Sequence, residues 1–202
     1  MIRITNAVKQ QADTIATLIM LAMNHECCKN FAGEKHTLED FHKMMKRLVE
    51  REDSQYSYKN TLVALDEDSK AVIGICVSYD GADLHTLRKA FIEEALKEFG
   101  IDYSGIDDET EKGELYIDSL AVDERFRKMG IASTLLKATL EKAKAFLMIP
   151  DYLNFLLTGK KANEYTNASS TQLVNSFDRT WDTKILDDFG INKDMFQEIK
   201  LP

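Results

Sequence analysis

The feature that most constrains this sequence is an apolar segment, followed by a short basic loop with one glycine and then by a segment with helical periodicity. Residues 114–122 (ELYIDSLAV) are rich in large apolar side chains and predict a strand. Apolar residues recur at helical spacing from Ser133 to about Phe146 and predict a helix. The first N–H groups of such a helix have no partner within it, and its positive end favours an anion. The pattern therefore predicts an anion-binding site, at which Gly130 and Ala132 let the backbone approach the ligand.

The basic loop resembles the Gln/Arg-x-x-Gly-x-Gly/Ala motif of the Gcn5-related N-acetyltransferases (the GNAT family), matched by Arg127, Gly130 and Ala132. The family's lead-in, an apolar residue, a valine and then an aromatic–arginine pair, is matched at 120–127 (LAVDERFR). In that family the motif holds the pyrophosphate of acetyl-coenzyme A, so the resemblance implies acetyl-CoA as co-substrate. The alternative is an ordinary helix start with a charged turn. The cofactor-binding residues that the resemblance implies are Leu120, Val122, Arg127, Lys128, Gly130, Ile131, Ala132 and Ser133.

The order of the remaining elements also matches the GNAT fold. Hydrophobic periodicity and turn residues predict a strand at 2–5, helices at 8–24, 38–50 and 84–99, and a hairpin of strands 61–65 and 71–79. Thr37 and Asp83 are the expected N-caps of the second and third helices, and residues 101–112 are expected to form a polar loop over the substrate cleft. Gly74 is expected to mark a bulge or a close backbone approach. The predicted fold class is α/β (α+β), a GNAT-like mixed, mainly antiparallel sheet flanked by helices.

From about Phe146 the sequence changes character, and Pro150 is expected to end the preceding helix. The GNAT fifth strand, and the helix whose tyrosine meets the leaving thiol, have no counterpart here. Instead, residues 148–159 (MIPDYLNFLLTG) and 163–173 (NEYTNASSTQL) resemble an internal piece of a rhamnulokinase-like sugar kinase of the FGGY family. This piece has neither a nucleotide-binding glycine loop nor the kinase's catalytic aspartate.

The two resemblances predict a chimera. We expect an acetyltransferase-like domain at 1–145 that lacks its usual C-terminal half, and a kinase-like fragment at 146–202, mostly helical or irregular, that is no independent domain. The sequence does not distinguish a natural fusion from an artefact. A sheet that lacks its fifth strand has an open edge, so a homodimer formed through that edge is possible.

The expected reaction is acetyl transfer to a primary amine of a small molecule or peptide. In the GNAT family a backbone N–H of the fourth strand stabilises the thioester oxyanion, and Leu120 is the matching position. Asp118 is our candidate for the base, although a solvated acid on the strand surface, or a chain of waters as proton acceptor, would also fit. By the strand's period of two, Asp118 shares its face with Glu114 and Tyr116. The alternatives are a non-catalytic acyl-CoA-binding remnant and, less favoured, a carbohydrate kinase fragment.

Composition narrows the partners and the compartment. A net charge of −8 argues against nucleic acid, no run is long enough to span a membrane, and three cysteines form no disulfide framework, so we expect a cytoplasmic protein. The four histidines show no metal-ligand spacing, so no metal is expected. Tyr103 and residues 107–109 are candidates for lining an acceptor site for a cationic amine, the alternative being a mobile acidic loop.

Overall fold

The structure is a computed structural model that describes residues 1–201. The chain divides into two compact units, residues 1–139 and residues 140 onward, and each is described by itself.

The first unit is built on a sheet of four strands in the order β1-β2-β3-β4, with every neighbouring pair antiparallel. Strands β2 and β3 form the predicted hairpin, and β4 lies at one edge of the sheet. The sheet matches the predicted fold class of a mainly antiparallel sheet flanked by helices. The strands are β1 (Ile2–Asn6), β2 (Thr61–Asp66), β3 (Val72–Asp80) and β4 (Leu115–Val122).

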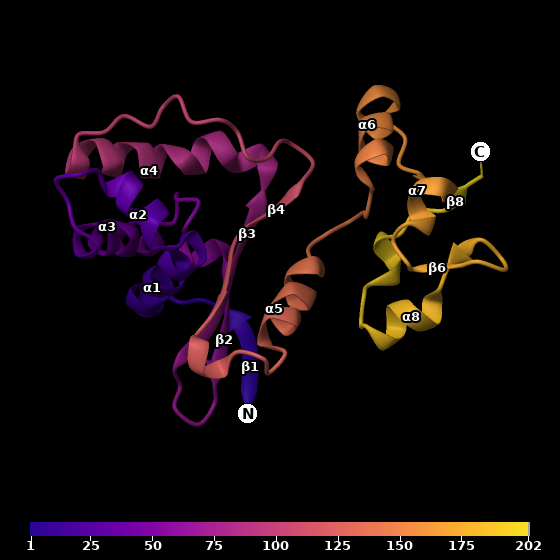
Figure 1. Cartoon of the computed structure of the whole chain (residues 1–202), viewed down its shortest axis with the longest axis horizontal. Helices are drawn as coiled ribbons and strands as arrows, with labels where there is room; N and C mark the ends of the chain where they lie inside the picture. Colours follow the sequence, from indigo (N-terminus) through magenta and orange to yellow (C-terminus); the bar gives the residue numbers. More distant parts are fainter. Residues whose placement is uncertain (202) are drawn as a thin grey trace. The chain divides into compact units, whose positions relative to one another are not determined.

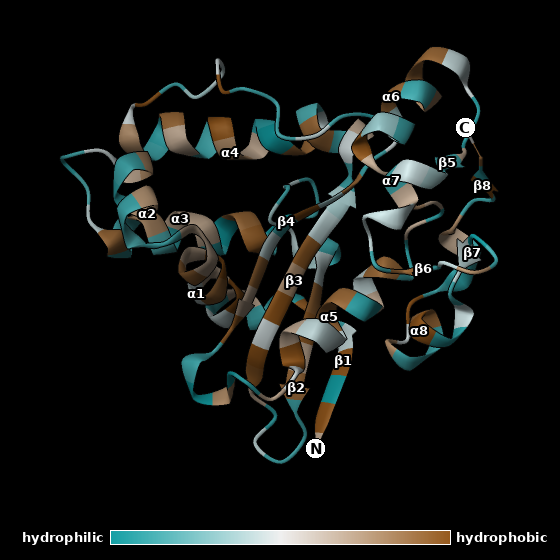
Figure 2. Ribbon diagram, turned by 45° about the vertical axis from the view of Figure 1, so that its right-hand side comes forward, coloured by the Kyte–Doolittle hydropathy of each residue, from teal (hydrophilic) through white to brown (hydrophobic). Residues whose placement is uncertain are grey.

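Helices cover both faces of this sheet, because alternate residues of the strands point to opposite sides (Figure 1). Val63 and Ile75 face the larger core, to which four helices contribute, whereas Leu62 and Ala64 pack with Ile131 on the other face. The helices on the first face are α1 (Ala12–Met23), α2 (His25–Ala32), α3 (Leu38–Glu50) and α4 (Leu84–Phe99), and the helix on the second is α5 (Ile131–Leu140). Figure 2 shows β3 as mostly apolar and the 101–113 segment beside α4 as mostly polar.

Local chemistry explains two features predicted from the sequence. Thr37 caps α3 reciprocally, since its Oγ1 accepts from Asp40 N at 3.2 Å while Asp40 Oδ2 accepts from Thr37 N at 2.9 Å. Gly74 lies beside a register shift between β2 and β3. A Cβ at this glycine would lie 3.2 Å from both Ala121 O and Leu135 Cδ1, so α5 and β4 approach the backbone here as closely as a glycine allows.

Three helix boundaries differ from the predictions. The predicted helix at 8–24 begins as a 3-10 turn at Lys9–Gln11 and ends before Asn24. Asn24, at φ 66°, caps the next helix, α2, by accepting a hydrogen bond from Cys27 N. Asp83 makes no capping hydrogen bond; Asp80 instead accepts from Ala82 N at 2.9 Å.

The third difference concerns the end of α5. Helix α5 begins at Ile131 and ends at Leu140, six residues before the predicted end at Phe146. Pro150 does not end it, because this proline lies in the first turn of a new helix, where its missing N–H costs no hydrogen bond.

The second unit consists of short elements around a small core. The buried carboxylate of Asp151 accepts from Asn163 Nδ2 at 3.3 Å and from Glu164 N at 3.0 Å. Phe146 packs here against Trp181 and Phe196. The elements are α6 (Ile149–Thr158), α7 (Tyr165–Ser169), α8 (Thr183–Asp188) and the strand pairs β5 (Asn163–Glu164) with β8 (Ile199–Lys200) and β6 (Val174–Asn175) with β7 (Thr180–Trp181). Across residues 1–201, no helix is long and apolar enough to cross a membrane.

Candidate functional site

A β-bulge in β4 sets the direction of the Asp118 side chain. In the pairing of β3 with β4, Val77 lies opposite Ser119 and Ser78 lies opposite Ile117, so Asp118 is the extra residue. A bulge bends its strand and redirects the side chain at the extra position. The predicted base therefore projects from an irregularity of the edge strand rather than from a regular ladder.

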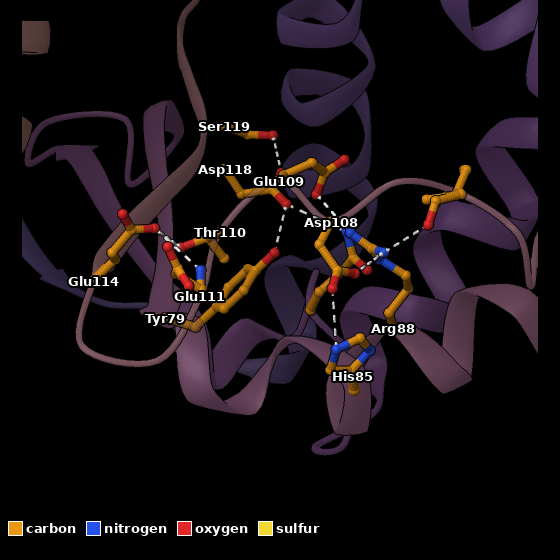
Figure 3. A network of polar contacts seen from close by, with 12 residues as sticks. Tyr79, His85, Arg88, Asp108, Glu109, Thr110, Glu111, Glu114, Asp118 and Ser119 are labelled. Atoms are coloured by element: carbon orange, nitrogen blue, oxygen red, sulfur yellow. Dashed lines mark hydrogen bonds and ion pairs between the residues drawn. The ribbon is translucent and has the colours of Figure 1, made fainter. Parts of the chain in front are cut away.

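Three side chains from different parts of the fold hold the Asp118 carboxylate. Its Oδ2 accepts a hydrogen bond from Tyr79 OH at 3.3 Å and another from Gln55 Nε2 at 3.3 Å. Its Oδ1 accepts from Ser119 Oγ at 2.8 Å, and Figure 3 shows the tyrosine and serine contacts. Tyr79 lies near the end of β3, whereas Gln55 comes from the connection between α3 and β2. The carboxylate is thereby fixed in orientation.

Burial raises the pKa of Asp118 to about 6. The hydrogen bond from Ser119 opposes this shift, the nearby negative charge of Glu109 adds to it, and the bonds from Tyr79 and Gln55 oppose it. A carboxylate with this pKa is mostly ionised at neutral pH but takes up a proton far more readily than an ordinary aspartate. That is the property required of a general base.

Three tyrosines lie close enough to Asp118 and Glu109 to be affected by their charges. Burial is the main reason that the pKa values of Tyr56, Tyr79 and Tyr116 lie above the ordinary tyrosine value, and the charges of Asp118 and Glu109 raise them further. The rings of Tyr79 and Tyr116 meet edge to face with centroids 5.5 Å apart. These phenols therefore remain neutral, and the wall that they form is aromatic and uncharged.

The acidic loop at 101–113 is anchored to α4 by Arg88. This arginine is only 6% exposed, and its Nη1 donates to Asp108 Oδ1 at 3.1 Å and to Ile106 O at 3.4 Å. Its Nη2 donates to Glu109 Oε2 at 3.2 Å, and His85 Nε2 lies 3.1 Å from Asp108 Oδ2 (Figure 3). The ion pairs place the Glu109 carboxylate where its charge acts on Asp118.

The end of the same loop is fixed at Gly81. Gly81 N donates to Glu114 O at 2.8 Å, and a Cβ at this glycine would lie 2.1 Å from Glu111 O. Glu114, predicted to share a strand face with Asp118, precedes β4 and accepts from Thr110 Oγ1 at 2.7 Å. Of the two residues predicted to share a strand face with Asp118, Tyr116 lies near it and Glu114 does not contact it.

Tyr103, one of the candidates for lining an acceptor site, packs against the helical core. Its hydroxyl donates to Phe31 O at 3.0 Å, and its ring packs edge-on against Phe31 and near Phe91. It therefore ties the loop to α2 and to the core.

The predicted cofactor loop lies between β4 and α5. After the 3-10 turn Glu124–Phe126, the backbone takes positive φ at Lys128 (64°) and Gly130 (76°), and α5 begins at Ile131. Thr134 N donates to Gly130 O at 3.0 Å, which is the first bond of the helix. The N–H groups of residues 131–133 precede that bond and have no intrahelical acceptor.

Two arginines of the loop make contacts with neighbouring residues, whereas Lys128 extends into solvent. Arg127 Nε donates to Val122 O at 3.3 Å, so this arginine folds back on the end of β4. Arg125 is paired with Asp123, with its Nη2 2.7 Å from Oδ2. Lys128 is exposed, and a Cβ at Gly130 would meet no described atom within 4 Å. The loop therefore offers an open backbone surface beside a lysine.

The other predicted cofactor residues flank this surface. Leu120 and Val122 are half-buried in β4, whereas the Ile131 side chain is buried in the smaller core, so only its backbone faces outward at the helix start. Ala132 is half-buried and Ser133 exposed. Val122 lies four positions after Asp118, about 13 Å along the strand, so the candidate base and the anion loop lie along one edge strand.

Sequence reasoning missed Gln55, Tyr79 and Arg88. Gln55 lies in an irregular connection, where no sequence pattern marks it. For Tyr79 the sequence predicted only that it ends a strand. A signal for Arg88 was present, since it follows Leu84 by four residues and precedes Phe91 by three on the apolar stripe of α4. A charged residue at such a position requires buried partners. Within residues 1–201 no group of three His, Cys, Asp or Glu side chains is placed to hold a metal.

Comparison with known proteins gives two distinct matches. The acetyltransferase (GNAT) family matches residues 23–166, and the N-terminal domain of the FGGY family of carbohydrate kinases matches residues 136–201. A rhamnulokinase from Halalkalibacterium halodurans is 71% identical over 62 residues, which are 31% of this chain and 13% of that relative. The chain thus spans about an eighth of that kinase's length.

Two solved structures are similar to most of the chain. A crystal structure of an acetyltransferase is 30% identical with a TM-score of 0.59, covering 70% of this chain and 74% of the other. An N-acetyltransferase from Staphylococcus aureus Mu50 is 22% identical with a TM-score of 0.58, covering 78% and 87%, and supports the fold alone. The kinase-like match in the last third confirms the expected chimera. The chain belongs to the GNAT acetyltransferase family, with an FGGY-like segment at its C-terminal end.

Proposed function

We propose that this chain transfers an acetyl group from acetyl-coenzyme A to a primary amine of a small molecule or peptide. The observation that carries the proposal is the position of Asp118, whose raised pKa and fixed carboxylate suit a base, on the strand that leads directly into the anion loop. Family membership supplies the reaction type, and this geometry supplies the residues that would carry it out.

The loop from Arg127 to Ser133 fits the pyrophosphate of acetyl-CoA. The first N–H groups of α5 and the positive end of its dipole favour an anion, and Gly130 has no Cβ to keep the ligand away. Lys128 is an exposed cation of this loop and can make a charge-assisted contact. Arg127 shapes the loop through its contact with Val122 O, and its half-exposed guanidinium is a second candidate for the charge-assisted contact with the pyrophosphate.

The remaining steps concern the proton and the developing charge. As the nitrogen–carbon bond forms and the carbon–sulfur bond breaks, Asp118 takes the proton that leaves the amine nitrogen. The backbone N–H of Leu120 is the proposed donor to the thioester oxyanion, a position taken from the family. The thiolate leaves and takes its proton from solvent water, because the usual family tyrosine has no counterpart in this chain, and Asp118 returns its own proton to water.

The chimera limits the expected rate. The family's fifth strand would splay from β4 and open the slot for the pantetheine arm. Without it the thioester is held loosely, and a misplacement of about 1 Å can cost on the order of a hundredfold in rate. We therefore propose weak coenzyme A binding and slow transfer, and we propose that the open edge of β4 pairs two copies of the chain. The second candidate function is a non-catalytic acyl-CoA-binding remnant, favoured by the same missing half.

The test is a melting-temperature titration with coenzyme A, followed by mass-spectrometric detection of acetylated product across a panel of primary amines. Stabilisation by coenzyme A together with product that disappears in Asp118→Asn supports the transferase. Stabilisation without product from any amine supports the binding remnant. If coenzyme A does not stabilise the chain and no product forms, both candidate functions are contradicted. Phosphorylation of L-rhamnulose by the chain would favour the kinase-like segment instead.

A further inference from the structure

Gln55 presents an unused acceptor beside the candidate base. Its side chain is buried, at 4% exposure, and its Nε2 donates to Asp118 Oδ2 at 3.3 Å. Among the described residues, Gln55 Oε1 is buried and has no hydrogen-bond partner. Since Oε1 and Nε2 are bonded to the same carbon, this oxygen lies near the Asp118 carboxylate.

The position of Gln55 is built into the fold. Its backbone N donates to Leu87 O of α4 at 3.3 Å, and Asn60 Nδ2 donates to Ser54 O at 3.1 Å, which fixes the connection on the other side. A buried carbonyl without a donor destabilises the fold, because it has lost the hydrogen bonds that water would give it. A fold that holds such a group rigidly against a base gains that energy back when a ligand N–H arrives.

We infer that Gln55 Oε1 and Asp118 together bind the amino group of the acceptor, each oxygen accepting one of its N–H groups. This inference rests on the proposed function and adds to it a second substrate-contacting residue. An amine that arrives as an ammonium group first releases one proton to solvent water, which leaves a neutral amine with two N–H groups and a lone pair. With both N–H groups held, the lone pair is left to attack the thioester.

The surroundings define the class of acceptor. Glu109 adds negative charge close to Asp118, and Tyr56, Tyr79 and Tyr116 form a neutral aromatic wall. The negative charges of Asp118 and Glu109 attract an ammonium group. The two acceptor oxygens then select for N–H groups. The expected ligand is therefore a small primary amine that arrives as a cation.

The experiment separates hydrogen bonding from charge by using two probes with the same charge. Butylammonium carries three N–H groups, and butyltrimethylammonium carries none. Their affinities are measured by titration calorimetry on the full chain in the presence of coenzyme A. The side-chain amide resonance of Gln55 is followed by nuclear magnetic resonance at the same time.

In the parent chain, butylammonium should bind more tightly than butyltrimethylammonium and should shift the Gln55 amide resonance saturably. Gln55→Met, which removes the acceptor oxygen at similar volume, should reduce that preference about tenfold. Gln55→Glu keeps an acceptor oxygen at this position and should retain the preference. The matched control, Gln10→Met at an exposed position, should behave as the parent.

A Gln55→Met chain that melts as the parent does and keeps the full preference would overturn the inference, as would a parent that shows no preference. If Gln55→Met fails to fold, the parent's preference and the shift of its Gln55 resonance decide the question. Failure of the transferase proposal gives a different pattern. In that case butylammonium binds as described but no amine is acetylated.

Discussion

The hydroxyl of Tyr79 donates to Oδ2 of Asp118 at 3.3 Å, between residues of two strands whose register shifts beside this contact. The bulge and the hydrogen bond act together, because the extra residue in β4 turns its carboxylate toward the tyrosine. The acid is thereby enclosed on the inner side of an edge strand, and its pKa of about 6 follows from that enclosure.

Acetyl transfer should rise with pH through about 6 and then level off, because only the ionised carboxylate of Asp118 accepts a proton. Asp118→Asn should lower the rate on the order of a hundredfold or more and abolish this rise. The measurement is the pH dependence of kcat/KM between pH 5 and 8. Asp107→Asn, an exposed change in the nearby loop, should leave the profile intact.

Asp118→Asn should also stabilise the fold at alkaline pH. The ordinary pKa of an aspartate is about 3.9, so the folded chain holds the Asp118 proton more tightly than the unfolded chain. Ionisation therefore opposes folding as pH rises from 3.9 to 6, by on the order of 3 kcal/mol when complete. Urea unfolding should show Asp118→Asn to be more stable than the parent at pH 8 and no more stable at pH 4. Equal stability at both values would contradict the buried carboxylate.

Arg88→Met should release the acidic loop from α4. The substitution keeps an apolar stem of similar length but leaves Asp108 and Glu109 without their shared partner. We expect a loss of about 2–4 kcal/mol in unfolding free energy and faster proteolytic cleavage within 101–113. The control is Arg3→Met, whose exposed arginine makes a 4.0 Å contact with Glu67. Protection of the loop in Arg88→Met would show that other contacts hold it.

Gly81→Ala tests the closure of the same loop. Its new Cβ would overlap the carbonyl oxygen of Glu111, so either the loop or the start of α4 must move. We expect a loss of about 2 kcal/mol or more in unfolding free energy, measured in urea. Gly105→Ala lies in the loop with nothing within 4 Å of its Cβ and should be neutral or slightly stabilising. Equal stability of the two variants would mean that the loop does not close on Gly81.

The sequence predicted those parts of the fold whose signals are local. The capping pair Thr37 and Asp40, the β2–β3 hairpin and the strand–loop–helix unit at Gly130 each depend on neighbouring residues, and each is present. The end of α5 was misplaced because apolar spacing continues through Phe146, whose ring packs instead with Trp181. Asp118 was predicted, but Gln55 and Tyr79 could not be, since only tertiary packing brings them to its carboxylate. Arg88 did leave a signal, as a charged residue on the apolar stripe of α4.

Titration calorimetry with coenzyme A shows whether the loop at Gly130 binds acetyl-coenzyme A. Gly130→Val places a branched side chain where the pyrophosphate would lie, while Gly100→Val introduces the same strain at a φ of 69° at the end of α4. The parent and Gly100→Val should bind coenzyme A weakly but measurably, and Gly130→Val should not bind it. Binding by a folded Gly130→Val as strong as that of the parent would contradict the account.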